Sequence, residues 1–271
     1  MTSKRGKLIY QSAENGELLE IREDGEQRYL YFENNAVQSA MLLQQPHILA
    51  LSYTRALTAG LIFNDEPRNT LMIGLGGGSL VRFWQRYFPT CELDVVDNRR
   101  DVIRSAEKYF GIRPGTHLHL FCEDGEAFLH RALQTRSRQY DMILVDAFDG
   151  AGIAAAMQSD RFFRAARGML AENGVFAMNL WSNDAAIFRH CFARIEQYFA
   201  EPALKLPVEG KGNVIALCGT ETLPLSDPEL PQRATELKAT TGIEFPTMLR
   251  TLLRHNGHDG PHWWQRLWPK S

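Results

Sequence analysis

The feature that most constrains this chain is a regular alternation of short apolar runs with amphipathic helical patterns between Thr70 and Cys218. Strands that are connected through helices need crossover connections, which place the strands parallel in one sheet with helices on both faces. The alternation therefore predicts an α/β fold with a mostly parallel sheet. We predict strands at 70–74, 92–97, 117–122, 140–146, 174–181 and 213–218, and helices near 79–88, 99–109, 124–135, 159–171 and 184–199.

One of these strands shows where a site should lie. In the segment YDMILVDAFDG, residues 142–145 are apolar without interruption, which is typical of a strand that is buried on both faces of a parallel sheet. Sheets of this kind bind ligands beyond the carboxyl ends of their strands, near the point where the strand order reverses. We therefore expect the functional residues in the loops that follow the strands.

The segments on either side of this alternation have different patterns. Residues 7–39 alternate apolar and polar side chains between ENG, EDG and ENN turns, which predicts a β meander or a pair of hairpins. Helical spacing begins after Pro46, and two short helices are expected between Thr235 and His255. We divide the chain into a small N-terminal β region, 1–45, and a Rossmann-like domain with a C-terminal helical tail, 46–271.

Composition excludes several classes of function. Thirty basic and 32 acidic side chains nearly balance, so no global charge favours nucleic acid or a membrane surface. The four cysteines are widely spaced, which is typical of free thiols in a reducing cytoplasm rather than of disulfides or a zinc site. We find no signal peptide and no apolar run of about 20 residues, so we expect a cytoplasmic protein without a membrane span.

The C-terminal tail carries histidines that could suggest a metal site. His255, His258 and His262 lie near three tryptophans, but a metal site needs a fixed geometry, and Gly257 and Gly260 leave the geometry of this segment loose. We therefore expect no metal. A tail packed on the domain or at an interface between subunits is the simpler interpretation.

The first strand-end loop, IGLGGGSL, is rich in glycine. Gly74, Gly76, Gly77 and Gly78 allow a sharp turn and a close approach to a ligand, and the helix that follows offers free N–H groups. A tight packing corner is the alternative interpretation. A dinucleotide fingerprint would place a third glycine where Ser79 stands, so a dehydrogenase is disfavoured.

The next two strands end in acidic residues. Asp97 lies where nucleotide-binding sheets place a carboxylate that accepts hydrogen bonds from the hydroxyls of a ribose. The alternative is a helix N-cap, a role that the neighbouring Asn98 could fill instead. Asp124, followed by Gly125, could contact an adenine amino group or cap its own helix.

The fourth strand ends in a pair of carboxylates, Asp146 and Asp149. Two carboxylates on the same rim repel each other and raise at least one pKa unless a cation lies between them. A polyamine would be such a cation. The alternative is that one aspartate caps a turn and the other is solvated.

Together, the motifs IGLGGGSL, ELDVVDNRRDVI, CEDGEAFL and YDMILVDAFDG, in this order and with the N-terminal AVQSAM, resemble the spermidine synthase (polyamine aminopropyltransferase) family. The resemblance implies the Rossmann-like sheet that this family shares with S-adenosylmethionine methyltransferases. It implies transfer of an aminopropyl group from decarboxylated S-adenosylmethionine, as a co-substrate rather than a tightly bound cofactor, to a polyamine such as putrescine. Exposed β segments near the N-terminus favour a homodimer.

The resemblance also assigns roles to residues. Asp97 would take the ribose, Asp124 and Gly125 the adenine edge, and Gln38 would lie near the co-substrate. The D-x-x-D pattern of the family matches Asp146 and Asp149, of which the first would orient and deprotonate the attacking amine. Tyr53 matches a tyrosine of the family pattern and is a candidate for the acceptor pocket. Trp181 is a candidate because it ends the fifth strand on the crevice side, with simple packing as the alternative, and Arg55 is a further candidate.

Two departures from the family pattern keep other functions open. Gly77 stands where the family carries an acid in its glycine loop, and no acid accompanies Tyr53. Without the first acid, the carboxylate of S-adenosylmethionine would meet no fixed negative charge, which suits a methyltransferase. A non-catalytic nucleoside-binding relative is the third alternative.

Overall fold

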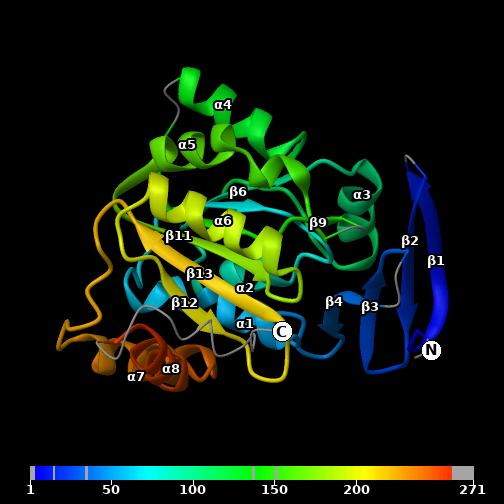
Figure 1. The fold of residues 1–271 in the computed structure, drawn as a ribbon. Coiled ribbons are helices and arrows are strands. Elements are labelled where there is room, and N and C mark those ends of the chain that lie inside the picture. The colour runs from blue at the N-terminus through cyan, green and yellow to red at the C-terminus, as the bar shows by residue number, and fades with distance from the viewer. Residues whose placement is uncertain (1–3, 15, 34–35, 136–137, 150–151, 258–271) are drawn as a thin grey trace, which may run out of the picture.

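The computed structural model describes residues 4–257, apart from 15, 34–35, 136–137 and 150–151. Its main element is a seven-stranded sheet, in which β13 runs antiparallel to both of its neighbours and the other strands are parallel. This confirms the predicted α/β class (Figure 1). The strand order is β12 (Leu204–Pro207), β13 (Asn213–Gly219), β11 (Leu170–Trp181), β8 (Tyr140–Val145), β5 (Asn69–Ile73), β6 (Glu92–Asp97) and β7 (Leu118–Cys122).

The strand order reverses beside β5. From β5 the chain proceeds outward to β6 and β7, then returns to the other side of β5 to add β8 and β11. The crossovers on the two sides of this point diverge, and a crevice forms beyond the carboxyl ends of β5 and β8. The glycine loop follows β5 and Asp146 follows β8, so both lie at this reversal.

Helices cover both faces of the sheet, as predicted. Met142 and Leu144 of β8 belong to one hydrophobic cluster, and Ile143 and Val145 belong to the other. This strand is therefore buried on both faces, which its continuous apolar run indicated. The first cluster contains side chains of α2 (Ser79–Tyr87), α3 (Arg100–Tyr109), α7 (Leu230–Thr241) and α8 (Phe245–Asn256), and the second those of α4 (Gly125–Gln134), α5 (Asp160–Met169) and α6 (Ala185–Tyr198).

The N-terminal strands form a separate antiparallel meander beside α3 (Figure 1). Buried side chains of this sheet, including Ile21 and Leu30, join the same hydrophobic cluster as α2 and α3. A helix then follows as α1 (Ser52–Leu57), continued by the 3-10 helix η1 (Thr58–Ile62). The four strands are β1 (Lys7–Glu14), β2 (Glu17–Glu23), β3 (Gln27–Tyr31) and β4 (Val37–Leu42), paired in chain order.

Polar contacts also fasten the N-terminal sheet to the amino end of α3. The Glu14 carboxylate accepts a hydrogen bond from the backbone N–H of Asp101 at 2.7 Å, and Arg99 forms an ion pair with Glu17 at 2.9 Å. Glu14 thus satisfies an N–H group in the first turn of α3. The suggestion that Asn98 caps this helix is wrong, because a more distant segment supplies the acceptor.

Four small elements, three short strands and a 3-10 helix, were not predicted. The strand β12 is short and contains a lysine and a proline; it pairs with β13, and Asn256 of α8 hydrogen-bonds to the backbone of Lys205. A two-residue hairpin of β9 (Phe148–Asp149) and β10 (Gly152–Ile153), followed by the 3-10 helix η2 (Ala155–Gln158), extends the loop after β8. Such short pairings depend on tertiary contacts more than on local sequence.

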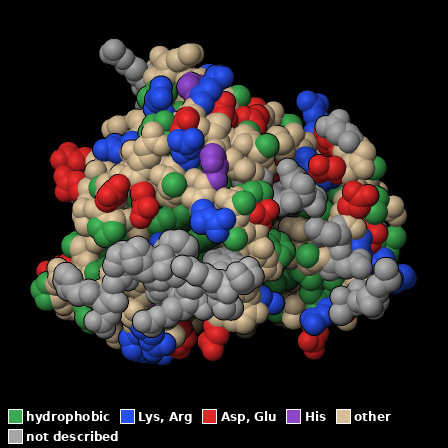
Figure 2. All heavy atoms as spheres, viewed as in Figure 1, with side chains coloured by type: hydrophobic (Ala, Val, Ile, Leu, Met, Phe, Trp, Pro, Cys, Tyr) green, Lys and Arg blue, Asp and Glu red, His purple; other side chains and the backbone are tan. Residues whose placement is uncertain are grey.

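The remaining global expectations concern thiols, charge and membranes. Cys91, Cys191 and Cys218 are buried and all four cysteines are free. Figure 2 shows basic and acidic side chains interspersed over the face in view. Within the described ranges, no helix is long and apolar enough to cross a bilayer, and no cluster of potential metal ligands is found. His258 and His262 lie outside these ranges.

Candidate functional site

A cavity of about 1510 Å³ lies between the N-terminal sheet and the carboxyl ends of the central strands. Residues from β4, α1 and the loops after β5, β6, β7, β8 and β11 all contribute to its walls. The fold thus collects at one place side chains that are far apart in the sequence. Nine of the residues predicted for the site line this cavity: Gln38, Tyr53, Gly74, Gly76, Asp97, Asp124, Gly125, Asp146 and Trp181.

The glycine loop divides into two parts. Gly74 has a φ of +98°, and a Cβ there would lie 2.2 Å from the backbone oxygen of Asp146, so only glycine fits. Gly77 and Gly78 are not among the residues that line the cavity. A Cβ on Gly77 would lie 2.7 Å from the hydroxyl of Ser39, and one on Gly78 would lie 2.5 Å from the side chain of Ile112. These two glycines therefore allow the loop to pack closely against Ser39 and Ile112.

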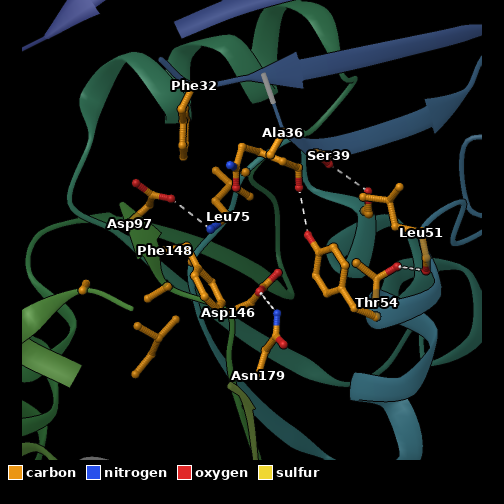
Figure 3. A pocket seen from close by; sticks show the side chains of 18 of the residues that line it. Phe32, Ala36, Ser39, Leu51, Thr54, Leu75, Asp97, Asp146, Phe148 and Asn179 are labelled. Carbon is orange, nitrogen blue, oxygen red and sulfur yellow. Dashed lines mark hydrogen bonds between the residues drawn. The ribbon is translucent and has the colours of Figure 1, made fainter. Parts of the chain in front are cut away.

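Asp97 ends β6 with its carboxylate fixed by backbone N–H groups. The N–H of Leu75 donates to it at 2.9 Å and that of Arg99 at 3.0 Å. Burial raises the pKa of Asp97, while these hydrogen bonds and the charge of Arg99 oppose the rise. Figure 3 shows this carboxylate directed at the backbone of Leu75 in the glycine loop, so the loop and the acid form one structural unit.

Asp124 occupies the position of a helix N-cap. Its carboxylate accepts a hydrogen bond from the N–H of Ala127 at 3.0 Å, at the start of α4. The capping alternative is therefore observed, and the same residue also lines the cavity. Gly125 permits close packing, since a Cβ there would lie 2.6 Å from Ile73.

Asp146 is the acidic group with the most unusual environment in the cavity. The amide Nδ2 of Asn179 donates to its Oδ1 at 2.9 Å, and Figure 3 shows the other oxygen pointing into the cavity. Burial raises the pKa of Asp146 to about 6, and the hydrogen bonds with Asn179 and Tyr53 limit the rise. This carboxylate therefore changes its protonation near neutral pH.

Tyr53 connects Asp146 to the N-terminal sheet. Its hydroxyl donates to the backbone oxygen of Gln38 at 2.8 Å. Burial raises the pKa of Tyr53 well above its usual value, and the adjacent carboxylate of Asp146 raises it further. Tyr53 thus stays protonated beside Asp146, with its hydroxyl proton donated to the backbone of Gln38.

Sequence reasoning missed the asparagines behind Asp146. Asn179 lies in β11 with only 3% of its surface exposed, and its Oδ1 accepts a hydrogen bond from Nδ2 of Asn213 at 3.0 Å. A signal was present, because Asn179 interrupts the otherwise apolar strand segment GVFAMNLW. A polar side chain at a buried strand position needs a partner, and here the partners are Asp146 and Asn213.

The remaining candidates have different surroundings. Trp181 is 39% exposed on the cavity wall, with its ring centroid 6.2 Å from that of Phe148 in an edge-to-face arrangement. Arg55 is wrong as a site candidate, because its guanidinium donates to the backbone oxygens of Leu49 and Ala50 instead of lining the cavity. The side chain of Asp149 lies outside what the structure describes.

A buried cation behind the glycine loop was also missed. The guanidinium of Arg82 donates to the backbone oxygens of Pro46, Gly77 and Phe110, and none of these recorded partners is a carboxylate. Burial lowers the pKa of Arg82 to about 10, so the group remains charged at neutral pH. It supplies positive potential beneath the loop.

Comparison with known proteins gives a consistent answer. A family model described as "Spermine/spermidine synthase domain" matches residues 51–205. The polyamine aminopropyltransferase of Chromobacterium violaceum is 33% identical over 246 residues, which is 90% of this chain and 92% of that protein.

Two solved structures share the fold. One is a spermidine synthase in complex with the transition state analogue AdoDATO, with a TM-score of 0.70, 15% identity, and coverage of 96% of this chain and 86% of that one. The other is human methyltransferase-like protein 13 in complex with SAH, with a TM-score of 0.60, 22% identity, and coverage of 81% and 100%.

The fold defines the class: a Rossmann-like protein with the sheet of the methyltransferases, preceded by a small antiparallel sheet. The family follows from the sequence matches. This chain belongs to the spermine/spermidine synthase family.

Proposed function

We propose that this protein is an aminopropyltransferase that uses decarboxylated S-adenosylmethionine and a polyamine acceptor such as putrescine. The observation that carries the proposal is the position of Asp146, a carboxylate with a pKa of about 6 that shares one cavity with Asp97 and the glycine loop. Its relative from Chromobacterium violaceum is named for the same type of reaction.

The nucleoside would bind along the ends of β5, β6 and β7. Asp97 would accept hydrogen bonds from the ribose hydroxyls, since its carboxylate is already fixed by the backbone. Asp124 and Gly125 would contact the adenine edge, and Gly74 and Gly76 would let the backbone approach the co-substrate. Gln38, on the opposite wall, would close over it. We call the five residues 74, 76, 97, 124 and 125 the nucleoside end.

The acceptor would bind beside Asp146, with Tyr53 and Trp181 as walls and Asp149 as a second acid. We call Tyr53, Asp146, Asn179, Trp181 and Asn213 the acceptor end. An ammonium group carries no lone pair, so the acceptor must lose a proton before it attacks. Above pH 6 the carboxylate of Asp146 is ionised and can take that proton.

The transfer then needs little further chemistry. The nitrogen lone pair attacks the aminopropyl carbon, the carbon–sulfur bond breaks, and its electron pair returns to sulfur to give a neutral thioether. The sulfonium is already an activated leaving group, so positioning, exclusion of water and deprotonation of the amine provide the catalysis. The buried surroundings of Asp146 serve the last two of these needs.

The test is direct. The purified chain is incubated with decarboxylated S-adenosylmethionine and putrescine, and products are followed by mass spectrometry. We expect an aminopropylated amine and the thioether nucleoside in equal amounts. Nucleoside binding without turnover on a panel of diamines and longer polyamines would contradict the proposal and favour a non-catalytic relative.

A second candidate, an S-adenosylmethionine-dependent methyltransferase, is favoured by the glycine loop. Ser39 occupies the space beside Gly77, so an acidic side chain there would require Ser39 to move, and the buried Arg82 adds positive charge. Such surroundings suit the carboxylate of S-adenosylmethionine. Calorimetry with S-adenosylmethionine and its decarboxylated form, together with the mass of the product, separates the two reactions.

We also propose that the chain works as a homodimer in the cytoplasm. Leu8 and Ile9 are large apolar residues that are exposed on β1, the edge strand of the N-terminal sheet. Exposed apolar side chains on an edge strand favour association with a second copy. Sedimentation of the wild type and of a Leu8→Lys, Ile9→Lys variant tests the assembly, and a monomeric wild type would contradict it.

A further inference from the structure

A chain of side-chain hydrogen bonds links Asp146 to two asparagines on the neighbouring strands. Asn179 of β11 donates to Asp146 at 2.9 Å, and Asn213 at the start of β13 donates to Asn179 at 3.0 Å. The strands β8, β11 and β13 are neighbours in the sheet, and Asn213 pairs with Trp181 of β11. The three side chains therefore form one hydrogen-bonded row from the cavity rim to Asp146.

We propose that Asn179 and Asn213 are positioning residues for Asp146, which hold one of its oxygens in an internal hydrogen bond and leave the other to the acceptor amine. This inference rests on the proposed function, because it assigns a purpose to the base of that reaction. It adds two residues of the cavity wall whose contribution to the reaction is made through the carboxylate.

The direction of the Asn179 amide determines its effect on Asp146. An asparagine side chain has a donor end and an acceptor end, and it can rotate to present either of them. Asn213 donates to Oδ1 of Asn179, which leaves Nδ2 of Asn179 facing Asp146. Without that second donor, the amide of Asn179 can turn and present its oxygen to Asp146.

The two directions have opposite effects on Asp146. A donor that faces a carboxylate stabilises its ionised form, whereas an acceptor stabilises the protonated form. Two side chains lower the pKa of Asp146: Asn179 from β11 and Tyr53 from α1. Both oppose the effect of burial, and the Asn179 amide donates directly to the carboxylate, so loss of this donor leaves a base that is less often ionised at pH 7.

The test compares two variants of the row with a matched control. Asn213→Ala removes the donor that fixes the amide, and Asn179→Leu removes the amide itself. The control is Asn256→Ala, because Asn256 also makes side-chain hydrogen bonds to backbone groups, those of Lys205 and Leu252, but lies between α8 and β12. Nucleoside affinity and thermal stability are measured for every variant.

The decisive readout is the pH profile of kcat/KM for aminopropyl transfer. For Asn213→Ala we expect the acidic limb to move up by about one pH unit, so that kcat/KM falls about twofold at pH 7 and about tenfold near pH 5, with recovery at higher pH. Asn179→Leu should show a larger shift in the same direction. Asn256→Ala should keep the wild-type limb, and nucleoside affinity should remain unchanged throughout.

A second measurement keeps the inference separate from the proposed function. Carbon-13 NMR of the labelled aspartate carboxyl groups, with Asp146 assigned through Asp146→Asn, reports its titration without any turnover. If the wild type transfers no aminopropyl group but the Asp146 titration moves in Asn213→Ala, the function fails and the positioning role stands. If transfer occurs but neither the limb nor the titration differs from those of Asn256→Ala, the positioning role is overturned.

Discussion

The nucleoside end and the acceptor end of the cavity are constructed differently. The nucleoside end consists of residues at or just beyond the carboxyl ends of three successive strands, β5, β6 and β7, where sheets of this kind bind ligands. The acceptor end combines one such residue, Asp146, with side chains from α1, β11 and β13.

This difference shows which properties of the site are local. The backbone around Asp97 and Gly74 determines the geometry of the nucleoside end, through hydrogen bonds to Leu75 and Arg99. At the acceptor end, side chains determine the geometry, and the protonation of Asp146 depends on partners from distant segments. We therefore expect substitutions at the nucleoside end to affect binding and those at the acceptor end to affect rate and pH dependence.

The largest effect is expected from Asp146→Asn. The amide retains the shape of the side chain but cannot accept the proton of the amine, so aminopropyl transfer should fall by about 10³-fold, within the range for loss of a general base. Nucleoside affinity should stay within about threefold, because Asp97 and the glycine loop are untouched. Calorimetry and turnover measure the two quantities.

A matched control is Asp141→Asn, at the opposite end of the same strand, where the carboxylate accepts hydrogen bonds from the backbone of Arg68 and Asn69. This variant should keep its kcat within about threefold, because Asp141 does not line the cavity. Equal turnover of Asp146→Asn and wild type would remove Asp146 from the mechanism.

Gly74→Ala tests whether the backbone determines the nucleoside end. Its φ of +98° and the 2.2 Å approach of a Cβ to the oxygen of Asp146 should together destabilise the fold by several kcal/mol. The control is Gly16→Ala, where φ is +84° and no atom lies within 4 Å, so only about 1–2 kcal/mol is expected. Urea unfolding gives the free energy of unfolding of both variants. Equal losses of stability would show that the structure relaxes around the methyl group added by Gly74→Ala, and that the close approach to Asp146 costs nothing further.

Asp97→Asn should weaken nucleoside binding by about 10- to 100-fold, the effect of losing hydrogen bonds to a charged acceptor. The acidic limb of the pH profile should not move, because Asp97 is not among the groups that shift the pKa of Asp146. If the acidic limb of the pH profile does move in Asp97→Asn, the nucleoside end and the acceptor end are coupled, and their separation into a binding part and a rate-determining part is wrong.

Trp181→Ala should raise KM for the polyamine by about two- to fivefold, since a cation over an aromatic face contributes about 0.5–1 kcal/mol at an exposed site. Its effect on nucleoside affinity should be smaller than that of Asp97→Asn. Trp181→Phe keeps an aromatic face and should recover most of the loss. An unchanged KM in both variants would place the acceptor elsewhere.

The smallest effect concerns stability. The folded-state pKa of Asp146 is raised to about 6 from an ordinary value of 3.8, so its ionisation opposes folding as pH rises through this interval. Asp146→Asn removes the penalty and should gain about 1–2 kcal/mol at pH 7.5, reduced for partial solvent access. Near pH 4 the gain should nearly vanish, and thermal melts at both pH values measure it.

Much of this architecture could be predicted from the sequence because periodicity is a local property. The apolar run at 142–145 identified a strand buried on both faces, and the alternation of strands and helices gave the class of fold. The acids after the strands, Asp97 and Asp146, could also be found, since a parallel sheet gathers the ends of its strands at one edge.

Tertiary structure decided what surrounds those acids. Glu14 reaches the first turn of α3, Ser39 fills the space beside Gly77, and Asn213 orients Asn179 only because β13 pairs with β11. None of these contacts follows from spacing along the chain, because each joins side chains from segments that meet only in the folded protein. The sequence thus determined which chemical groups stand at the strand ends, and the packing of distant segments determined their protonation and direction.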